Sequence, residues 1–245
     1  MAEKKQFVAT DEAKGKAKQL RLIAFILWIL ALGAQVWAIT ELFKDPITMW
    51  IIITLIVVDL ALVIVGSLLW KKSNKLDPPS EKRAFLFFMQ SQLGLITAVI
   101  AFLPLVIFIL TNKNIDKKQK AILGGIAGAA LVIAGISGAD FNPPSVEKYT
   151  EQINQQTDLI TDLTNGVDHV YWTPSGNKLH VFDDCQHIRN SDVSDGTVKD
   201  AWEARGIDDN EVCKTCINRA EKLKSQDNAN VIDAVGDVLE DATEE

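Results

Sequence analysis

The chain has 245 residues, of which 48% are hydrophobic and 23% charged, and its net charge is −7. The charges are divided unevenly: residues 1–139 carry sixteen Lys/Arg and nine Asp/Glu, whereas residues 140–245 carry nine and twenty-three. A basic, apolar half joined to an acidic, polar half excludes a single uniform soluble domain and predicts a membrane unit linked to a soluble unit.

Residues 1–20 are polar and rich in lysine, which predicts a disordered or surface-lying segment ahead of the first apolar run. Four apolar runs follow, and each is about as long as the 17–25 residues that a helix needs to cross a bilayer. The runs cover residues 22–43, 47–70, 84–110 and 121–138. The fourth run is short and rich in Gly and Ala, so a buried soluble helix is the alternative there. Four runs in succession predict an all-α polytopic membrane bundle over residues 21–140.

Small residues recur every fourth position along the fourth run. They are Gly124 and Gly128, followed by Ala130, Ala134 and Gly138. Such faces let two helix backbones approach closely, either within one chain or between chains. A homo-oligomer in the lipid bilayer is therefore one expectation.

Positive charges predict the orientation of the bundle, because Lys and Arg in short loops favour the cytoplasmic side. Residues 1–21 and 71–83 together hold eleven Lys/Arg, against five on the opposite side. Both termini are therefore expected in the cytoplasm, although four lysines in the third loop oppose this bias. A secretory signal peptide cleaved near residues 36–38 is the alternative for the first run, but the long polar start and long apolar run favour a retained anchor.

Polar side chains interrupt the predicted spans at three positions that matter for function. Asp59 lies near the middle of the second run, Gln35 near the middle of the first, and Gln92 within the third. A carboxyl group at such depth is costly and usually faces the interior of the bundle. We expect a protonated Asp59 to hydrogen-bond to Gln35 and so hold two helices together. A proton or ion path through these residues is the alternative.

A stalk helix is expected over residues 145–165. Ser145 is a good N-cap after the prolines that end the fourth span, and Gly166 suits a helix end. Two rows of residues on this helix repeat every seven positions: Val146, Ile153 and Ile160, and Tyr149, Gln156 and Leu163. The pattern fits either a short coiled coil or an amphipathic helix that packs on the module after it.

Residues 169–223 contain all three cysteines and all three histidines of the chain, and they predict a small α+β module. A hairpin is expected from Val170–Thr173 and Lys178–Phe182 around a Pro-Ser-Gly-Asn turn. His169 precedes the hairpin and is expected to face solvent. The acidic tail, residues 224–245, is expected to be either a short helix or a disordered end.

A short helix follows the hairpin. Thr197 is expected to cap it, with Asp200 three residues later completing a capping box, and the helix should run through Trp202. Arg205 and Gly206 then end the helix.

The cysteines predict a metal site. Cys213-x-x-Cys216 has the spacing of a metal-binding knuckle, which lets both sulfurs face one ion, and Cys185 supplies a third sulfur. His180 is favoured as the fourth ligand because it lies on the second strand of the hairpin, with four residues between it and Cys185, and His187 is held in reserve. Three thiolates and one imidazole would fill the coordination shell of a structural Zn²⁺ ion, leaving no open position for catalysis.

These motifs resemble the small Ada-type metal-binding module over residues 170–218. The matching residues are Tyr171, Thr173, Gly176, His180, Cys185, Cys213 and Cys216. The resemblance implies a bound zinc ion and a bacterial origin, because similar modules form C-terminal appendages on bacterial nuclease, competence and membrane proteins. The DNA-repair member of the family holds its metal with four cysteines and methylates one of them; the three cysteines here do not support that activity. No family resemblance covers the four spans.

The combined pattern predicts a multi-pass protein of the bacterial cytoplasmic membrane that is not an enzyme. We expect a scaffold, adaptor or sensor whose zinc module recruits an unidentified cytoplasmic protein. An oligomeric channel or transporter-like pore gated by the module is the alternative. A nucleic-acid-processing factor is disfavoured, because residues 140–245 carry an excess of fourteen negative charges and duplex binding depends on Lys and Arg.

Overall fold

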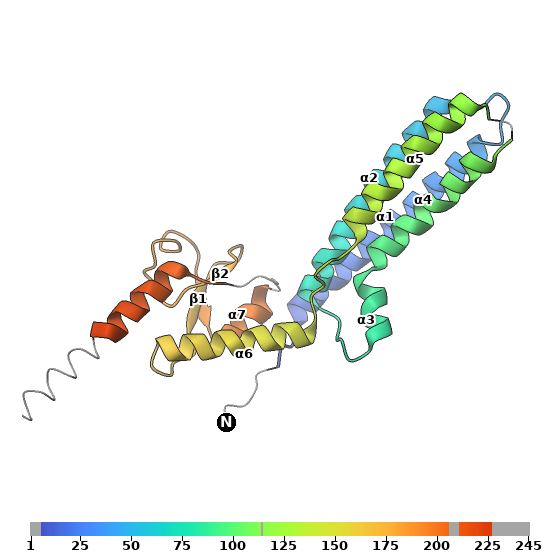
Figure 1. Cartoon of the computed structure of the whole chain (residues 1–245). Coiled ribbons are helices and arrows are strands. Elements are labelled where there is room, and N and C mark those ends of the chain that lie inside the picture. Colours follow the sequence, from blue (N-terminus) through green and yellow to red (C-terminus); the bar gives the residue numbers. More distant parts are fainter. Residues whose placement is uncertain (1–5, 114, 206–210, 227–245) are drawn as a thin grey trace, which may run out of the picture. The chain divides into compact units, whose positions relative to one another are not determined.

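The computed structural model describes residues 6–113, 115–205 and 211–226 and divides into two compact units (Figure 1). The first, called the helical bundle below, comprises residues 11–146. The second, called the Cys/His unit, combines residues 147–245 with residues 1–10. Most of the predicted acidic tail, residues 227–245, lies outside the described residues.

Four helices of the bundle are long and apolar enough to span a membrane: α1 (Asp11–Glu41), α2 (Met49–Leu76), α4 (Leu93–Thr111) and α5 (Lys117–Gly138). They run side by side in Figure 1. α1 begins at Asp11, so residues 11–20 are helical, and of the two alternatives for this part of the polar segment the disordered one is wrong. Acidic Asp11 and Glu12 in its first turn suit a helix N-terminus.

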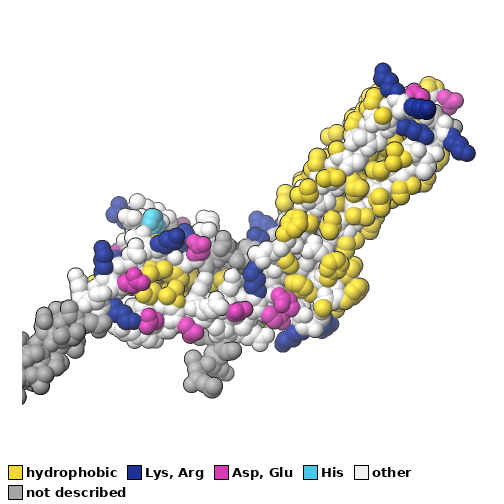
Figure 2. All heavy atoms as spheres, viewed as in Figure 1, with side chains coloured by type: hydrophobic (Ala, Val, Ile, Leu, Met, Phe, Trp, Pro, Cys, Tyr) yellow, Lys and Arg dark blue, Asp and Glu magenta, His cyan; other side chains and the backbone are white. Residues whose placement is uncertain are grey.

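Apolar side chains lie both inside the bundle and on its outer surface. Ile52, Phe102 and Leu105 are fully buried between the helices, whereas Ile29 and Val36 are more than half exposed. Figure 2 shows hydrophobic side chains covering the sides of the bundle, with Lys and Arg at its ends. An apolar exterior of this kind is suited to lipid and costly in water, which indicates a multi-pass membrane protein.

The predicted third span is wrong as a single helix. Residues 84–110 form two helices, α3 (Ala84–Ser91) and α4, with Gln92 between them, and α3 bends away from α4 in Figure 1. The side chain of Gln92 donates to the Asp140 carbonyl at 2.7 Å and accepts from the Asp140 N–H at 3.2 Å. α4 alone has 19 residues, about 28 Å at 1.5 Å per residue, which is enough to cross the hydrocarbon core.

The Cys/His unit contains short elements around two paired ladders. They are α6 (Val146–Leu163), β1 (Val170–Trp172), β2 (Lys178–Leu179), β3 (Ser194–Gly196), α7 (Val198–Arg205) and β4 (Glu211–Val212), followed by helical residues 214–226. β1 pairs antiparallel with β3, and β2 pairs parallel with β4. An antiparallel bridge between Tyr171 and His180 joins the two ladders, so the predicted hairpin forms with shorter strands than expected.

Local signals place the helices of this unit as predicted. α6 begins directly after Ser145, and Gly166 takes a φ of +97° and donates its N–H to the Thr161 carbonyl at 2.7 Å. The Thr197 N–H donates to the Asp200 carboxylate at 2.9 Å, and the Asp200 N–H donates to the Thr197 hydroxyl at 3.2 Å. This reciprocal pair is the predicted capping box at the start of α7.

The heptad face of α6 is buried within the Cys/His unit. Tyr149 and Ile153 are fully buried, and the Tyr149 ring lies 4.9 Å from the ring of Trp202 on α7. Gln156 accepts a 2.8 Å hydrogen bond from the Trp202 indole. Of the two alternatives, the structure therefore matches the amphipathic helix packed on its own module, because the seam that a coiled coil would use is occupied.

Candidate metal centre

The parallel ladder of β2 and β4 brings two metal-ligating residues together. His180 follows β2 directly and Cys213 follows β4 directly, so neighbouring strand ends deliver both side chains to one place. The Cys213 N–H donates to the Leu179 carbonyl at 2.8 Å, and the His180 N–H donates to the Tyr171 carbonyl at 2.8 Å. These backbone bonds set the Cα positions of both residues relative to one another.

The other two cysteines lie in turns beside this ladder. Cys185 begins a tight turn in which its carbonyl accepts from the N–H groups of Ile188 and Arg189, at 2.9 and 3.1 Å. Cys216 lies in the first turn of the helix at residues 214–226, where the Ile217 N–H donates to the Cys213 carbonyl at 3.0 Å. The C-x-x-C segment therefore turns from β4 into a helix and presents both sulfurs on one side.

The ligand atoms of His180, Cys185, Cys213 and Cys216 all lie within 4.8 Å of one another, and all four residues are buried. The Cys216 Sγ lies 3.7 Å from the His180 Nδ1. A tetrahedral ion bound to sulfur at about 2.3 Å and to nitrogen at about 2.0 Å sets neighbouring ligand atoms roughly 3.5–3.8 Å apart. The cluster is close enough to hold a metal ion, and its three sulfurs and one nitrogen are compatible with zinc.

The remaining histidines lie outside this cluster. His187 is exposed, its Nε2 is 3.2 Å from the Thr215 hydroxyl, and its ring centroid is 6.4 Å from that of His180. His169 lies with its Nε2 3.4 Å from the Asp195 carboxylate and its ring edge-on to Tyr171. Of the two histidines considered for the fourth ligand, the structure thus groups His180 with the cysteines.

Burial shifts the pKa values of two of the four ligands, His180 and Cys216. Burial, followed by the charges of His187, Arg205 and Lys178, lowers the pKa of His180, which favours the neutral imidazole that binds metals. Burial raises the pKa of the Cys216 thiol to about 12, so that thiol is protonated at neutral pH. Metal binding would therefore displace a proton from Cys216 but none from His180.

Arg219 supports the cysteine side of the cluster. Its guanidinium forms a 2.6 Å ion pair with Asp184 and lies 4.1 Å above the centre of the Phe182 ring. Its positive charge lies close enough to Cys185 and Cys216 to favour a negative charge on their sulfurs. A cation beside a thiolate favours the deprotonated form that binds metals.

Arg205 holds the turn that leads into β2, a role that the sequence did not reveal. It is buried at the end of α7 and donates through Nη1 to the carbonyls of Gly176 and Lys178, at 2.6 and 3.3 Å. Burial lowers its pKa to about 10, which still leaves it cationic at neutral pH. The sequence indicated only that Arg205 ends a helix, because its carbonyl partners lie almost thirty residues earlier in a turn.

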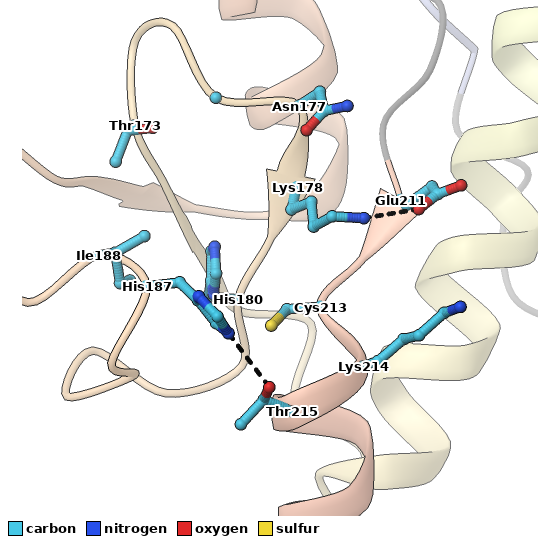
Figure 3. Close-up of a pocket in the computed structure, with 11 residues that line it drawn as sticks. Thr173, Asn177, Lys178, His180, His187, Ile188, Glu211, Cys213, Lys214 and Thr215 are labelled. Atoms are coloured by element: carbon cyan, nitrogen blue, oxygen red, sulfur yellow. Dashed lines mark hydrogen bonds and ion pairs between the residues drawn. The ribbon is translucent and has the colours of Figure 1, made fainter.

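A cavity of about 380 Å³ opens beside the cluster, and His180 and Cys213 form part of its wall (Figure 3). Lys178 and Glu211, joined by a 2.6 Å ion pair, line another part. His187 also contributes. The cavity thus places charged and hydrogen-bonding groups directly beside the buried ligands.

The polar residues of the bundle do not form the expected pair. Gln35 donates to the Ile100 carbonyl at 3.2 Å instead of binding Asp59. Asp59 is buried, and neither of its carboxyl oxygens has a hydrogen-bond partner among the described residues. Gln92 binds the backbone of Asp140 at the end of α5. The predicted hydrogen bond between Asp59 and Gln35 is therefore wrong, because the amide reaches the backbone of α4.

Comparison with known proteins gives no relative: no family model, no curated protein and no solved structure matches this chain. The resemblance of residues 170–218 to the Ada-type module therefore depends on its motif residues alone and stays a proposal.

Proposed function

We propose that the Cys/His unit binds one structural zinc ion through His180, Cys185, Cys213 and Cys216. The observation that carries this proposal is the convergence of four buried ligand atoms within 4.8 Å from four separate positions in the sequence. Cys/His shells of this composition are typical of structural zinc sites. The similarity of residues 170–218 to the Ada-type module supports the same metal.

The zinc ion would stabilise the unit and would not perform catalysis. Four protein ligands complete a tetrahedral shell and leave no position for a reactive water molecule. The cysteines themselves form the apolar cluster at this end of the unit, together with Ile188. A cluster this small stabilises little on its own, so metal binding would supply much of the folding free energy.

We further propose that the protein is a membrane-anchored adaptor or sensor that presents this unit to a cytoplasmic protein. The bias of Lys and Arg in the loops and the need of thiolates for a reducing compartment both favour the cytoplasm. Hydrogen bonds within the Cys/His unit join residues 7–8 to residues 150 and 203. They support placing the chain before the first span and the chain after the fourth span on the same side of the membrane. The cavity beside the metal cluster supports a recognition role.

The test of this function is metal analysis of the purified full-length protein and two histidine variants. We expect one zinc ion per chain by elemental mass spectrometry, and X-ray absorption should report three sulfur neighbours near 2.3 Å. His180→Ala should weaken zinc binding at least about 100-fold because it removes a ligand, whereas His187→Ala should retain wild-type affinity. Wild-type protein without zinc, or a His187 variant that loses it, would refute the assignment.

An oligomeric pore gated by the Cys/His unit is the other candidate. Asp59 favours this alternative, because its carboxyl group is buried in the bundle without a hydrogen-bond partner among the described residues. Gln35 and Gln92 are instead engaged with backbone groups, which gives a polar lumen little support. Under the adaptor proposal, Asp59→Asn should leave ion and proton flux through proteoliposomes unchanged from wild type. A flux in wild-type vesicles that disappears in the variant would favour the pore.

A further inference from the structure

The residues immediately ahead of α1 are bound to the Cys/His unit. Phe7 is only 2% exposed, and its ring meets the ring of Tyr149 edge-on, with centroids 5.0 Å apart. The Phe7 N–H donates to the Thr150 hydroxyl at 3.1 Å, and the Val8 N–H donates to the Glu203 carboxylate at 2.9 Å. Residues 7–9, called the docked segment below, are therefore held by both an aromatic contact and backbone hydrogen bonds.

Two helices of the unit build the site for the docked segment. Tyr149 and Thr150 lie on α6, and Glu203 lies on α7. The contact of Tyr149 with Trp202, and the Trp202 hydrogen bond to α6, hold the two helices together. The site exists only while α7 keeps its place on α6.

The position of α7 depends in turn on the strands that carry the metal ligands. Arg205, the last residue of α7, donates to the carbonyls of Gly176 and Lys178, at the turn into β2. β2 and β4 are two residues long each, and their pairing is secured where His180 and Cys213 meet. Without a metal, so short a ladder has little to hold it, and Arg205 would lose its fixed acceptors.

We propose that the docked segment binds the Cys/His unit only while the metal is present, so that metal occupancy is communicated to the segment that leads into α1. This inference rests on the proposed zinc site. The chain enters the bundle at Asp11, two residues beyond the end of the docked segment, and leaves it at Val146, the first residue of α6. In the metal-loaded protein the Cys/His unit holds the chain on both sides of the bundle sequence, through the docked segment before Asp11 and through α6 after it. In the metal-free protein only α6 would connect the folded unit to the bundle.

Thermodynamic reciprocity provides the test, because a segment that binds only the metal-loaded unit must itself strengthen metal binding. Zinc affinity is measured by competition with a chromophoric chelator on the full-length protein in detergent. We expect Phe7→Ala to weaken zinc binding by about fivefold or more. The matched control is Val8→Ala. The Val8 side chain is 53% exposed, and its truncation leaves the hydrogen bond of the residue 8 N–H in place, so this variant should bind zinc like wild type.

Hydrogen exchange of the same proteins gives the second readout. Zinc removal with EDTA should speed exchange of the amides of residues 7 and 8 at least about tenfold, because both lose their acceptors. Thr150→Val, which removes one acceptor and keeps the side-chain shape, should speed exchange at residue 7 with zinc still bound. If Phe7→Ala binds zinc as tightly as wild type, or EDTA leaves residues 7 and 8 protected, the coupling is wrong although the zinc site stands. Failure of the wild-type protein to bind zinc would instead refute the proposed function.

Discussion

Replacing Cys213 with serine should unfold the Cys/His unit while the helical bundle remains folded. Cys213 supplies one of the four clustered ligand atoms and is only 2% exposed, within the small apolar cluster of Cys185, Ile188 and Cys216. Zinc binding contributes about 10–16 kcal/mol in small structural sites, whereas whole domains are stable by only about 5–15 kcal/mol. Serine is a poor zinc ligand, so the variant should lose most of the zinc-binding free energy. That loss should exceed the stability that the remaining apolar core gives to the unit.

Limited proteolysis in detergent, with zinc content measured in parallel, distinguishes the two units. The variant should be cleaved within residues 147–226 and leave a resistant fragment that contains the four long helices. The matched control is Lys214→Ala, one residue further along, whose side chain points away from Cys213 in Figure 3. A zinc-free Cys213→Ser protein whose C-terminal unit still resists protease would show that the unit folds without metal.

The metal cluster could be predicted from the sequence because its signal is chemical and local. Cys and His are rare in this chain, and the C-x-x-C spacing by itself brings Cys213 and Cys216 to one face of a turn. Choosing between His180 and His187 needed only the expectation that a hairpin delivers the first of them beside Cys185. The capping box of Thr197 and Asp200 was predictable for the same reason, since both partners lie within one helical turn.

The features that escaped prediction depend on partners far away in the sequence. The break at Gln92 is tied to the backbone of Asp140, 48 residues later, and apolar periodicity carries no information on that contact. The heptad on α6 revealed an apolar face but not which surface covers it, and Phe7 was placed in a polar segment although it is buried. The hydrogen bond between Asp59 and Gln35 was predicted only from their similar depth in the membrane, whereas the direction of each side chain decides its partner.

Substituting Gly138 with alanine should destabilise the bundle, although glycine-to-alanine changes usually stabilise helices. The stripe of Ala130, Ala134 and Gly138 is buried inside one chain, so these three residues serve packing within the bundle. A Cβ at Gly138 would lie 2.5 Å from the carbonyl carbon of Gly94 and 2.6 Å from its oxygen. Both atoms belong to the backbone, so α4 and α5 would have to separate.

The direction in which the unfolding midpoint shifts distinguishes overpacking from the usual gain of a glycine-to-alanine change. Overpacking of this kind costs about 1–3 kcal/mol, which we expect as a lower thermal unfolding midpoint of the detergent-solubilised bundle. The matched control is Gly125→Ala on the same helix, where a Cβ meets nothing within 4 Å. That substitution should raise stability by up to about 1 kcal/mol, because alanine loses less backbone entropy on folding than glycine. If both variants shift the midpoint upward, the close approach of α4 and α5 at Gly94 and Gly138 does not exist in solution.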